Sequence, residues 1–315
     1  MLLFLTTPEE DYLQDSLLLG LRAVLGAGVV DYPRKDLLYQ DCPRPAETLY
    51  GRGFTLWKTL PEIPIDRTRI EERWQRGEFS GVVFARIAHQ LPWLRQWERR
   101  GWLRGRPVAL LESEDNAGFT KRQMWNGLWA LGLRFPLYKR ERDDFNRWFA
   151  RPIAFAIPDA KMRAVPLSKT QLFAKHVQCD EAYKLPAVAA HCQKRYAFAA
   201  ESAYYEDIGR SHYAITMKKA GWDCMRHYEI AANGTVMAFY QLAEKPVGCA
   251  PYGLKDMENV VAFRTAAELQ IKLDYIAAHG LYPALQHQTQ AWAQRQSCGA
   301  RAREFLQDWL PTLYP

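Results

Sequence analysis

Short apolar segments with strand character alternate with helix-like segments along both halves of this chain. In the first half, strand-like runs at residues 2–6, 29–33, 77–87 and 106–115 are separated by segments with apolar residues at helical spacing. In the second half, the runs QLFAKHV, RYAFA, HYAIT, TVMAFYQ and NVVAF are again separated by helix-like segments. Strands that alternate with helices pair in parallel, with helices covering both sheet faces. We therefore expect an α/β protein.

A charged, proline-containing segment separates the two halves. Residues 134–168 hold four prolines and the charge run KRERDD, which is typical of a junction between domains. A length of 315 residues also suits about two domains. We expect two Rossmann-like, doubly wound lobes, over residues 1–150 and 151–290. Ligands of such lobes bind at the carboxyl ends of the strands, here in a cleft between the lobes.

The composition is that of a folded protein with an anionic partner. Hydrophobic residues make up 48% and charged residues 24% of the chain, and the formal net charge is +7. This charge favours a nucleotide, a nucleic acid, a membrane surface or an acidic glycan as partner, without choosing among them. Basic residues are interleaved with acids and tryptophans, so the uniform basic stripe of a duplex-binding module is missing. Solvated helix faces are the simpler explanation.

The chain shows no membrane-spanning or secretory pattern. The opening MLLFLTT is followed by acids and lacks both a basic region and the length of a signal peptide. No other run reaches the roughly 18 apolar residues that span a bilayer. The six cysteines are scattered and form no disulfide framework. We expect a cytoplasmic protein with reduced thiols.

The stretch GWDCMRHYEIAANG, residues 221–234, carries the strongest candidate site. A helix expected to begin near Trp222 follows the strand HYAIT, so its free N–H groups suit a pyrophosphate. At 100° per residue, Arg226, Glu229 and Asn233 share one polar face. Arginine offers a planar fork for phosphate and glutamate offers two acceptors for ribose hydroxyls. The alternative is that Arg226 and Glu229 form a surface pair spaced i, i+3.

The same stretch resembles the donor-binding signature of GT-B glycosyltransferases. The pattern of strand, glycine loop, Arg-x-aromatic-Glu, small residues, Gly and strand is similar to that of the spore-maturation CgeB-like group and of the family-1 C-terminal domain. The runs NVVAFRTAAELQIKLDYIAAHG and QAWAQRQSCGARAREFLQDW resemble the segments that follow it there. Upstream, EDYLQDSLLLGLRAVLGAGVVDYPR and GRGFTLW resemble the N-terminal lobe of related proteins.

The resemblance implies sugar transfer from a nucleotide diphosphate sugar, with UDP as one possible nucleotide. It implies Glu229 on the ribose, Arg226 near the diphosphate, an acceptor on the first lobe, and a closing helix over residues 291–315 that packs back toward that lobe. The expected donor site comprises Lys218, Lys219, Gly221, Trp222, Asp223, Arg226, Tyr228, Glu229 and Asn233.

One position departs from the resembled pattern. Retaining members carry a glutamate eight positions before the ribose glutamate, where this chain has Gly221. The stereochemistry and the sugar are therefore left open. Lys218 and Lys219 are the nearest groups that neutralise a leaving diphosphate without a metal, although they also fit the description of solvated flanking charges.

Candidate acid–base residues follow the strands of the first half. Glu112, Glu114 and Asp115 end one strand, so Asp115 is a candidate general base or metal ligand, or else part of an acidic strand end that caps the next helix. Asp11 and His89 follow two other strands and are further candidates, with ordinary helix N-terminal roles as the alternatives.

Metal binding is not expected. The spacing of His176, Cys179, His191 and Cys192 fits no standard zinc site. We expect a metal-independent glycosyltransferase that uses no cofactor beyond its nucleotide-sugar donor and acts on a glycan, protein or other hydroxyl acceptor. The alternatives are a non-catalytic nucleotide- or nucleic-acid-binding protein on the same fold and a glycosyltransferase that acts on DNA.

Overall fold

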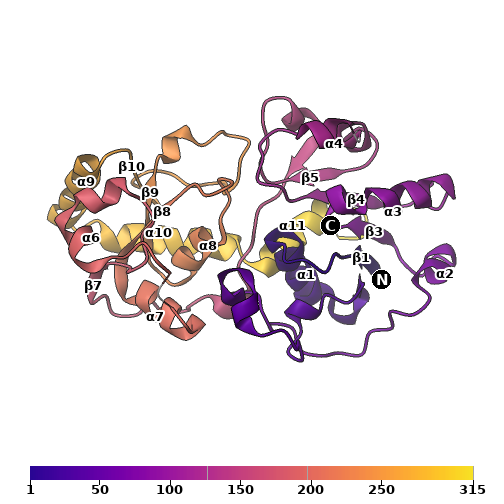
Figure 1. Cartoon of the computed structure of the whole chain (residues 1–315), viewed down its shortest axis with the longest axis horizontal. Coiled ribbons are helices and arrows are strands. Elements are labelled where there is room, and N and C mark those ends of the chain that lie inside the picture. Colours follow the sequence, from indigo (N-terminus) through magenta and orange to yellow (C-terminus); the bar gives the residue numbers. More distant parts are fainter. Residues whose placement is uncertain (126, 197, 315) are drawn as a thin grey trace. The chain divides into compact units, whose positions relative to one another are not determined.

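The chain divides into two compact units (Figure 1). The computed structural model describes residues 1–125, 127–196 and 198–314. Unit 1 comprises Met1–Pro158, Gly248–Ala250 and Cys298–Pro315, and unit 2 comprises Asp159–Val247 and Pro251–Ser297. The first boundary falls within the proline-containing segment. The limits expected for independent domains stay a prediction.

Unit 1 is built on a parallel sheet with the strand order β2-β1-β3-β4-β5-β6 in the described residues. Every neighbouring pair runs parallel, as the alternation of strands and helices predicted. Strands β5 and β6 were not predicted from the sequence, because they are short and lie in the segment with the composition of a domain junction. The strands are β1 (Leu2–Leu5), β2 (Val29–Tyr32), β3 (Gly81–Phe84), β4 (Val108–Glu112), β5 (Leu137–Lys139) and β6 (Ala150–Pro152).

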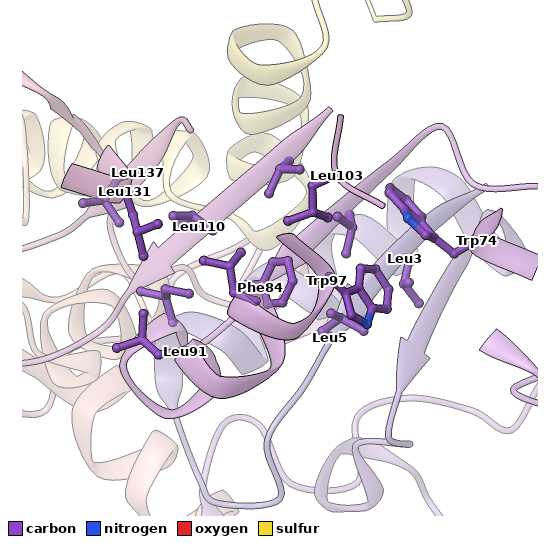
Figure 2. Packing of buried hydrophobic residues seen from close by; sticks show 14 of the residues in the cluster. Leu3, Leu5, Trp74, Phe84, Leu91, Trp97, Leu103, Leu110, Leu131 and Leu137 are labelled. Carbon is purple, nitrogen blue, oxygen red and sulfur yellow. The ribbon is translucent and has the colours of Figure 1, made fainter. Parts of the chain in front are cut away.

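Except for the last one, the helices of unit 1 connect these strands, and they pack against the sheet. Tryptophan and leucine side chains from them fill one core with the apolar residues of β1, β3 and β4. Figure 2 shows part of this core, in which Trp97 packs against Trp74 with ring centroids 5.4 Å apart. The helices are α1 (Tyr12–Leu25), α2 (Ile70–Gln75), α3 (Ile87–Arg99), α4 (Lys121–Trp125), α5 (Leu128–Gly132) and α11 (Cys298–Trp309).

The last helix, α11, packs against the first helix, α1 (Figure 1). Their contact is closest at Gly20, where an added Cβ atom would lie 2.0 Å from the carbonyl oxygen of Cys298. Only glycine permits this approach. The resemblance implied one closing helix over residues 291–315, whereas a break at Gln296 and Ser297 separates α11 from the helix before it.

Unit 2 contains a second parallel sheet, with the order β10-β9-β8-β7. The central strands β8 and β9 correspond to HYAIT and TVMAFYQ. The expected strand RYAFA is wrong: residues 195, 196, 198 and 199 form no strand, and residue 197 lies outside the described residues. The strands are β7 (Gln171–Phe173), β8 (Ser211–Met217), β9 (Val236–Tyr240) and β10 (Val261–Phe263). The helices are α6 (Pro186–His191), α7 (Glu201–Arg210), α8 (Met225–Ala232), α9 (Ala266–Ala278) and α10 (Tyr282–Arg295).

Helix α8 starts later than the sequence suggested. It begins at Met225 rather than near Trp222, so residues 218–224 form a loop between β8 and α8. Gly234 ends the helix region with φ +66°, the left-handed conformation that glycine adopts without strain. The predicted order of strand, loop, helix, glycine and strand is thus correct.

Candidate functional site

The strongest candidate site lies at the carboxyl end of β8 in unit 2. The chain leaves the sheet at Met217, passes through the loop and enters α8, which carries Arg226 in its first turn and Glu229 one turn later. Besides Arg226 and Glu229, the other six of the eight α8 residues are all buried. The helix is therefore packed on most of its surface, and its polar side chains are held in defined places.

Glu229 is buried and accepts a hydrogen bond from a tyrosine. Only 7% of Glu229 is exposed, and its Oε2 accepts from the Tyr204 hydroxyl at 2.7 Å. Burial and the neighbouring Glu229 raise the pKa of Tyr204 well above its ordinary value. Tyr204 therefore keeps its proton and donates a hydrogen bond to the carboxylate. The surface-pair alternative is wrong, because Glu229 is buried and no ion pair in the described residues joins it to Arg226.

Arg226 is half-buried and carries its charge without an ion pair. Within the part of the chain that the structure describes, its guanidinium makes neither a hydrogen bond nor a salt bridge. Burial acts to lower the pKa of Arg226, but the fields of Tyr204, Cys224 and Glu229 outweigh burial and raise it. The fork of donors is thus charged and available to an anion.

The loop before α8 adds two exposed lysines. The Lys218 Nζ lies 5.4 Å from the centroid of the Trp222 ring, a cation–π contact. The Lys219 backbone N–H donates to the Gly221 carbonyl at 3.0 Å. Although Lys219 is exposed as a whole, partial burial of its amine and the charge of Arg226 lower the pKa of that amine. Three cationic side chains therefore belong to one loop and helix start.

Three other predicted site residues have structural partners. Tyr228 donates to Asp223 Oδ1 at 2.6 Å and stacks on Trp292, with ring centroids 5.4 Å apart. Tyr228 is fully buried, so contact with a ligand would require it to leave the core. Asn233 donates to the Glu229 carbonyl at 2.8 Å, at the opposite end of the helix from Arg226. Their predicted roles in binding stay predictions.

Two supporting residues were missed by sequence reasoning. Tyr204 lies on α7, 25 positions before its partner Glu229, and no local motif connects the two. His227 joins the loop to the sheet: its Nδ1 lies 3.1 Å from Thr216 Oγ1 and its Nε2 lies 3.0 Å from the Trp222 carbonyl. The i, i+5 spacing of Trp222 and His227 was visible, but nothing in it signalled this contact.

In unit 1, Asp11 lies between a helix start and two strand ends. Its Oδ1 accepts from the Gln14 N–H at 2.9 Å and so caps α1. Its Oδ2 lies 3.3 Å from Arg86 Nε and accepts from the Ser113 hydroxyl. The helix-capping alternative is therefore correct for Asp11, and it leaves the carboxylate in an ion pair with Arg86, a residue the sequence did not single out.

The other acid–base candidates of unit 1 have different surroundings. His89 Nε2 lies 3.9 Å from Glu114 Oε1, and both line a hollow of about 540 Å³ together with Thr120 and Gln123. Asp115 instead forms an ion pair with Arg140. Of the three candidates, only His89 lines this hollow.

The described residues hold neither a cluster of metal ligands nor a helix suited to a membrane. Across residues 1–125, 127–196 and 198–314, no three His, Cys, Asp or Glu side chains are placed to hold a metal ion. Within the same ranges, no helix combines the length and apolar character needed to cross a membrane.

Solved structures share the arrangement of sheets and helices described above. No protein-family model matches the chain, and no curated protein matches its sequence. A glycosyltransferase from Rickettsia africae ESF-5 is similar with a TM-score of 0.58 and 10% identity, over 99% of this chain and 98% of that one. Anabaena Alr3699/HepE in complex with UDP-glucose is similar with a TM-score of 0.58 and 9% identity, over 98% of both chains.

The chain has the GT-B fold. At such identities the likeness is one of fold, so the chemistry must be argued from the residues of the site. In this GT-B chain, Arg226 and Glu229 lie at the carboxyl end of one parallel sheet, and Asp11 and His89 follow strands of the other.

Proposed function

We propose that this protein is a glycosyltransferase that takes a sugar from a nucleoside diphosphate sugar and that unit 2 binds this donor. One observation carries the proposal: a buried carboxylate fixed by Tyr204 lies one helical turn from an unpaired arginine, at the end of a parallel strand. A ribose needs hydrogen-bond acceptors and a diphosphate needs cationic donors. This strand end supplies both.

The chemistry follows from the charges of the donor. Glu229 accepts hydrogen bonds from the ribose hydroxyls, with Tyr204 holding its Oε2 in place. Arg226 donates to the diphosphate together with the N–H groups that begin α8. When the bond between the sugar and the diphosphate breaks, negative charge grows on the leaving oxygen. A fixed cation stabilises that charge more in the transition state than in the ground state.

In this proposal, unit 1 binds the acceptor. The hollow of about 540 Å³ beside His89 and Glu114 is the expected place for a hydroxyl acceptor. His89, whose Nε2 lies 3.9 Å from Glu114 Oε1, takes the proton of the attacking hydroxyl. Asp11 and Asp115 remain the other candidate bases. The reaction proceeds without a metal or a further cofactor, and in the cytoplasm.

Fold and sequence both support this proposal. The fold is shared with a protein whose structure contains UDP-glucose, and the Arg-x-x-Glu stretch is similar to that of CgeB-like glycosyltransferases. Gly221 favours a second candidate, a nucleotide-binding protein without catalysis, because a sugar-facing carboxylate is missing at that position.

The test separates these two candidates. The full chain is screened by thermal shift against UDP-, GDP-, ADP- and dTDP-sugars, and each stabilising donor is then assayed for release of free nucleotide with and without sugar acceptors. A donor at 100 times its dissociation constant adds about 2.7 kcal/mol to the free energy of unfolding. Stabilisation with turnover supports the transferase, and stabilisation without turnover on any acceptor supports the binding protein. No stabilisation by any donor contradicts both.

A further inference from the structure

His176 carries a buried nitrogen without a partner. The residue follows β7 at its carboxyl end, only 6% of it is exposed, and its ring meets Tyr196 edge-on at a centroid distance of 5.1 Å. Within the described residues, its Nδ1 has no hydrogen-bond partner. A buried polar atom without a partner is costly, so such an atom needs an explanation.

A small cavity lies beside the His176 side chain. Its volume is about 10 Å³, and it is lined by His176, Tyr204, Asp207 and Arg226 together with apolar side chains. This volume is at the lower limit for one water molecule. No nucleotide group fits a space of that size.

Two of the four polar side chains around the cavity are already occupied. Asp207 accepts from Gln171 Nε2 and from the Lys175 N–H, each at 2.9 Å. The Tyr204 hydroxyl donates to Glu229. The unsatisfied Nδ1 of His176 and the guanidinium of Arg226 remain. One is an acceptor when the ring is neutral and the other is a donor, and a water molecule joins such a pair by accepting from one and donating to the other.

The electrostatics of His176 agree with this arrangement. Burial, and then the charge of Arg226, lower the pKa of His176 to about 4, while the backbone of Arg195 and Gln193 favours the protonated ring to a smaller extent. The ring is therefore neutral near pH 7. The neutral tautomer with its proton on Nε2 leaves Nδ1 as an acceptor.

We propose that one ordered water molecule occupies this cavity and links His176 Nδ1 to the Arg226 guanidinium, which makes His176 a positioning residue for Arg226. The consequence for donor binding rests on the proposed function. An arginine anchored in this way loses less side-chain freedom when a diphosphate binds. Without the anchor, binding costs roughly 1 kcal/mol more, a factor of about three to ten in affinity.

The link itself is tested without a nucleotide. A crystal structure that resolves ordered waters should show one within hydrogen-bond distance of both His176 Nδ1 and Arg226. In solution, a proton-NMR titration should show a higher pKa for His176 in Arg226→Met than in the wild type, because a nearby positive charge is removed. A dry cavity, or an unchanged pKa of His176 in that variant, overturns the proposal whether or not the protein binds nucleotides.

The positioning role is tested with UDP and calorimetry. His176→Phe keeps a ring but removes the acceptor, and should weaken UDP binding three- to tenfold. His176→Asn places an amide oxygen near the former Nδ1 and should recover most of that loss. The loss should vanish when His176→Phe is combined with Arg226→Met. The matched control is His212→Asn at the other end of β8, where the ring contacts Gln171 O at 3.1 Å; it should bind UDP normally.

The outcomes separate the two proposals. If the wild type binds none of UDP, GDP, ADP and dTDP, the proposed function fails and the structural and NMR tests still decide the water link. If the wild type binds UDP and correctly folded His176→Phe binds it equally well, the positioning role of His176 is wrong.

Discussion

Arg226 and Glu229 are three residues apart, and their surroundings differ. Glu229 is buried and hydrogen-bonded to Tyr204, whereas Arg226 is half-buried and charged. A buried carboxylate persists only with such partners, since its desolvation is costly. The structure thus holds a carboxylate and a cationic side chain within one helical turn, as the proposed binding of ribose hydroxyls and phosphate requires.

The first prediction at the residue scale concerns Glu229→Gln. Glutamine can still accept from Tyr204, so the fold should survive, but the charge-assisted bonds to the ribose are lost. We expect nucleotide affinity to fall by about 1–3 kcal/mol, measured by calorimetry with UDP. Glu258→Gln, at an exposed pair with Lys255 in the same unit, serves as the control. Equal affinity in Glu229→Gln and the wild type would remove Glu229 from the site.

The second prediction concerns Arg226→Lys, which keeps the charge but loses the planar fork. Because charge on the diphosphate grows in the transition state, the variant should lose kcat more than it raises KM. We expect kcat to fall at least tenfold, or about 1.4 kcal/mol, in a steady-state assay of nucleotide release. Arg210→Lys, at an exposed pair on α7, should turn over normally. Normal turnover by Arg226→Lys as well would exclude Arg226 from the chemistry.

The third prediction concerns pH and His227. Burial lowers the pKa of His227 to about 3, below the unfolded value of about 6.5. Between those values the unfolded chain binds a proton that the folded chain does not, so the free energy of unfolding falls as the pH falls. His227→Gln removes this group. Its stability should therefore fall less than that of the wild type between pH 7 and pH 5, by about 2 kcal/mol.

Urea unfolding at both pH values measures this difference. Burial raises the pKa of Asp15 to about 6, so Asp15 makes the free energy of unfolding rise as the pH falls. Asp15 is present in both proteins, so its contribution cancels in the comparison. The exposed His287 provides the control variant, His287→Gln, which should behave like the wild type. Parallel pH profiles for His227→Gln and the wild type would contradict the prediction.

At the scale of elements, the contact of α1 with α11 is the tightest point to test. Gly20→Ala would place a Cβ atom 2.0 Å from the Cys298 carbonyl oxygen, which belongs to the backbone and cannot rotate away. The helices must then separate, and overpacking of this kind costs about 1–3 kcal/mol or more. We expect a lower urea midpoint for Gly20→Ala. Gly28→Ala, whose Cβ atom would approach no closer than 3.7 Å to Leu25, should stay near the wild type.

At the scale of the whole molecule, unit 1 is assembled from distant parts of the chain. The chain leaves unit 1 after Pro158, returns at Gly248–Ala250 and returns again at Cys298 with α11. The final segment is therefore part of the first core, although it follows all of unit 2 in sequence.

Removal of residues 298–315 tests this assembly. The deletion uncovers the buried face of α1 and should expose the amides of β1 and β3 to hydrogen exchange, while β8 and β9 of unit 2 keep their protection. Mass spectrometry of peptides from both units measures the difference. If the amides of β8 and β9 lost as much protection as those of β1 and β3, the stability of unit 2 would depend on α11 as much as that of unit 1, and the prediction would be wrong.

Periodicity and local motifs determined much of this protein from sequence alone. Apolar runs at strand spacing predicted parallel sheets, and the stretch from HYAIT through Arg226 and Glu229 to Gly234 predicted its strand, helix and turn, because these signals depend on residues near one another in the chain. The net charge of +7 and the presence of glycine at position 221 also follow from the sequence without a structure.

Only the tertiary structure decided which groups meet. Tyr204 reaches Glu229 from another helix, Arg86 pairs with Asp11 from another strand end, and His176 faces the same cavity as Arg226 from 50 positions earlier in the chain. RYAFA has the composition of a strand yet forms none in its described residues. The physical reason is common to all of these: burial and partner choice depend on how distant segments pack, and local propensity carries no information about a neighbour that is distant in sequence.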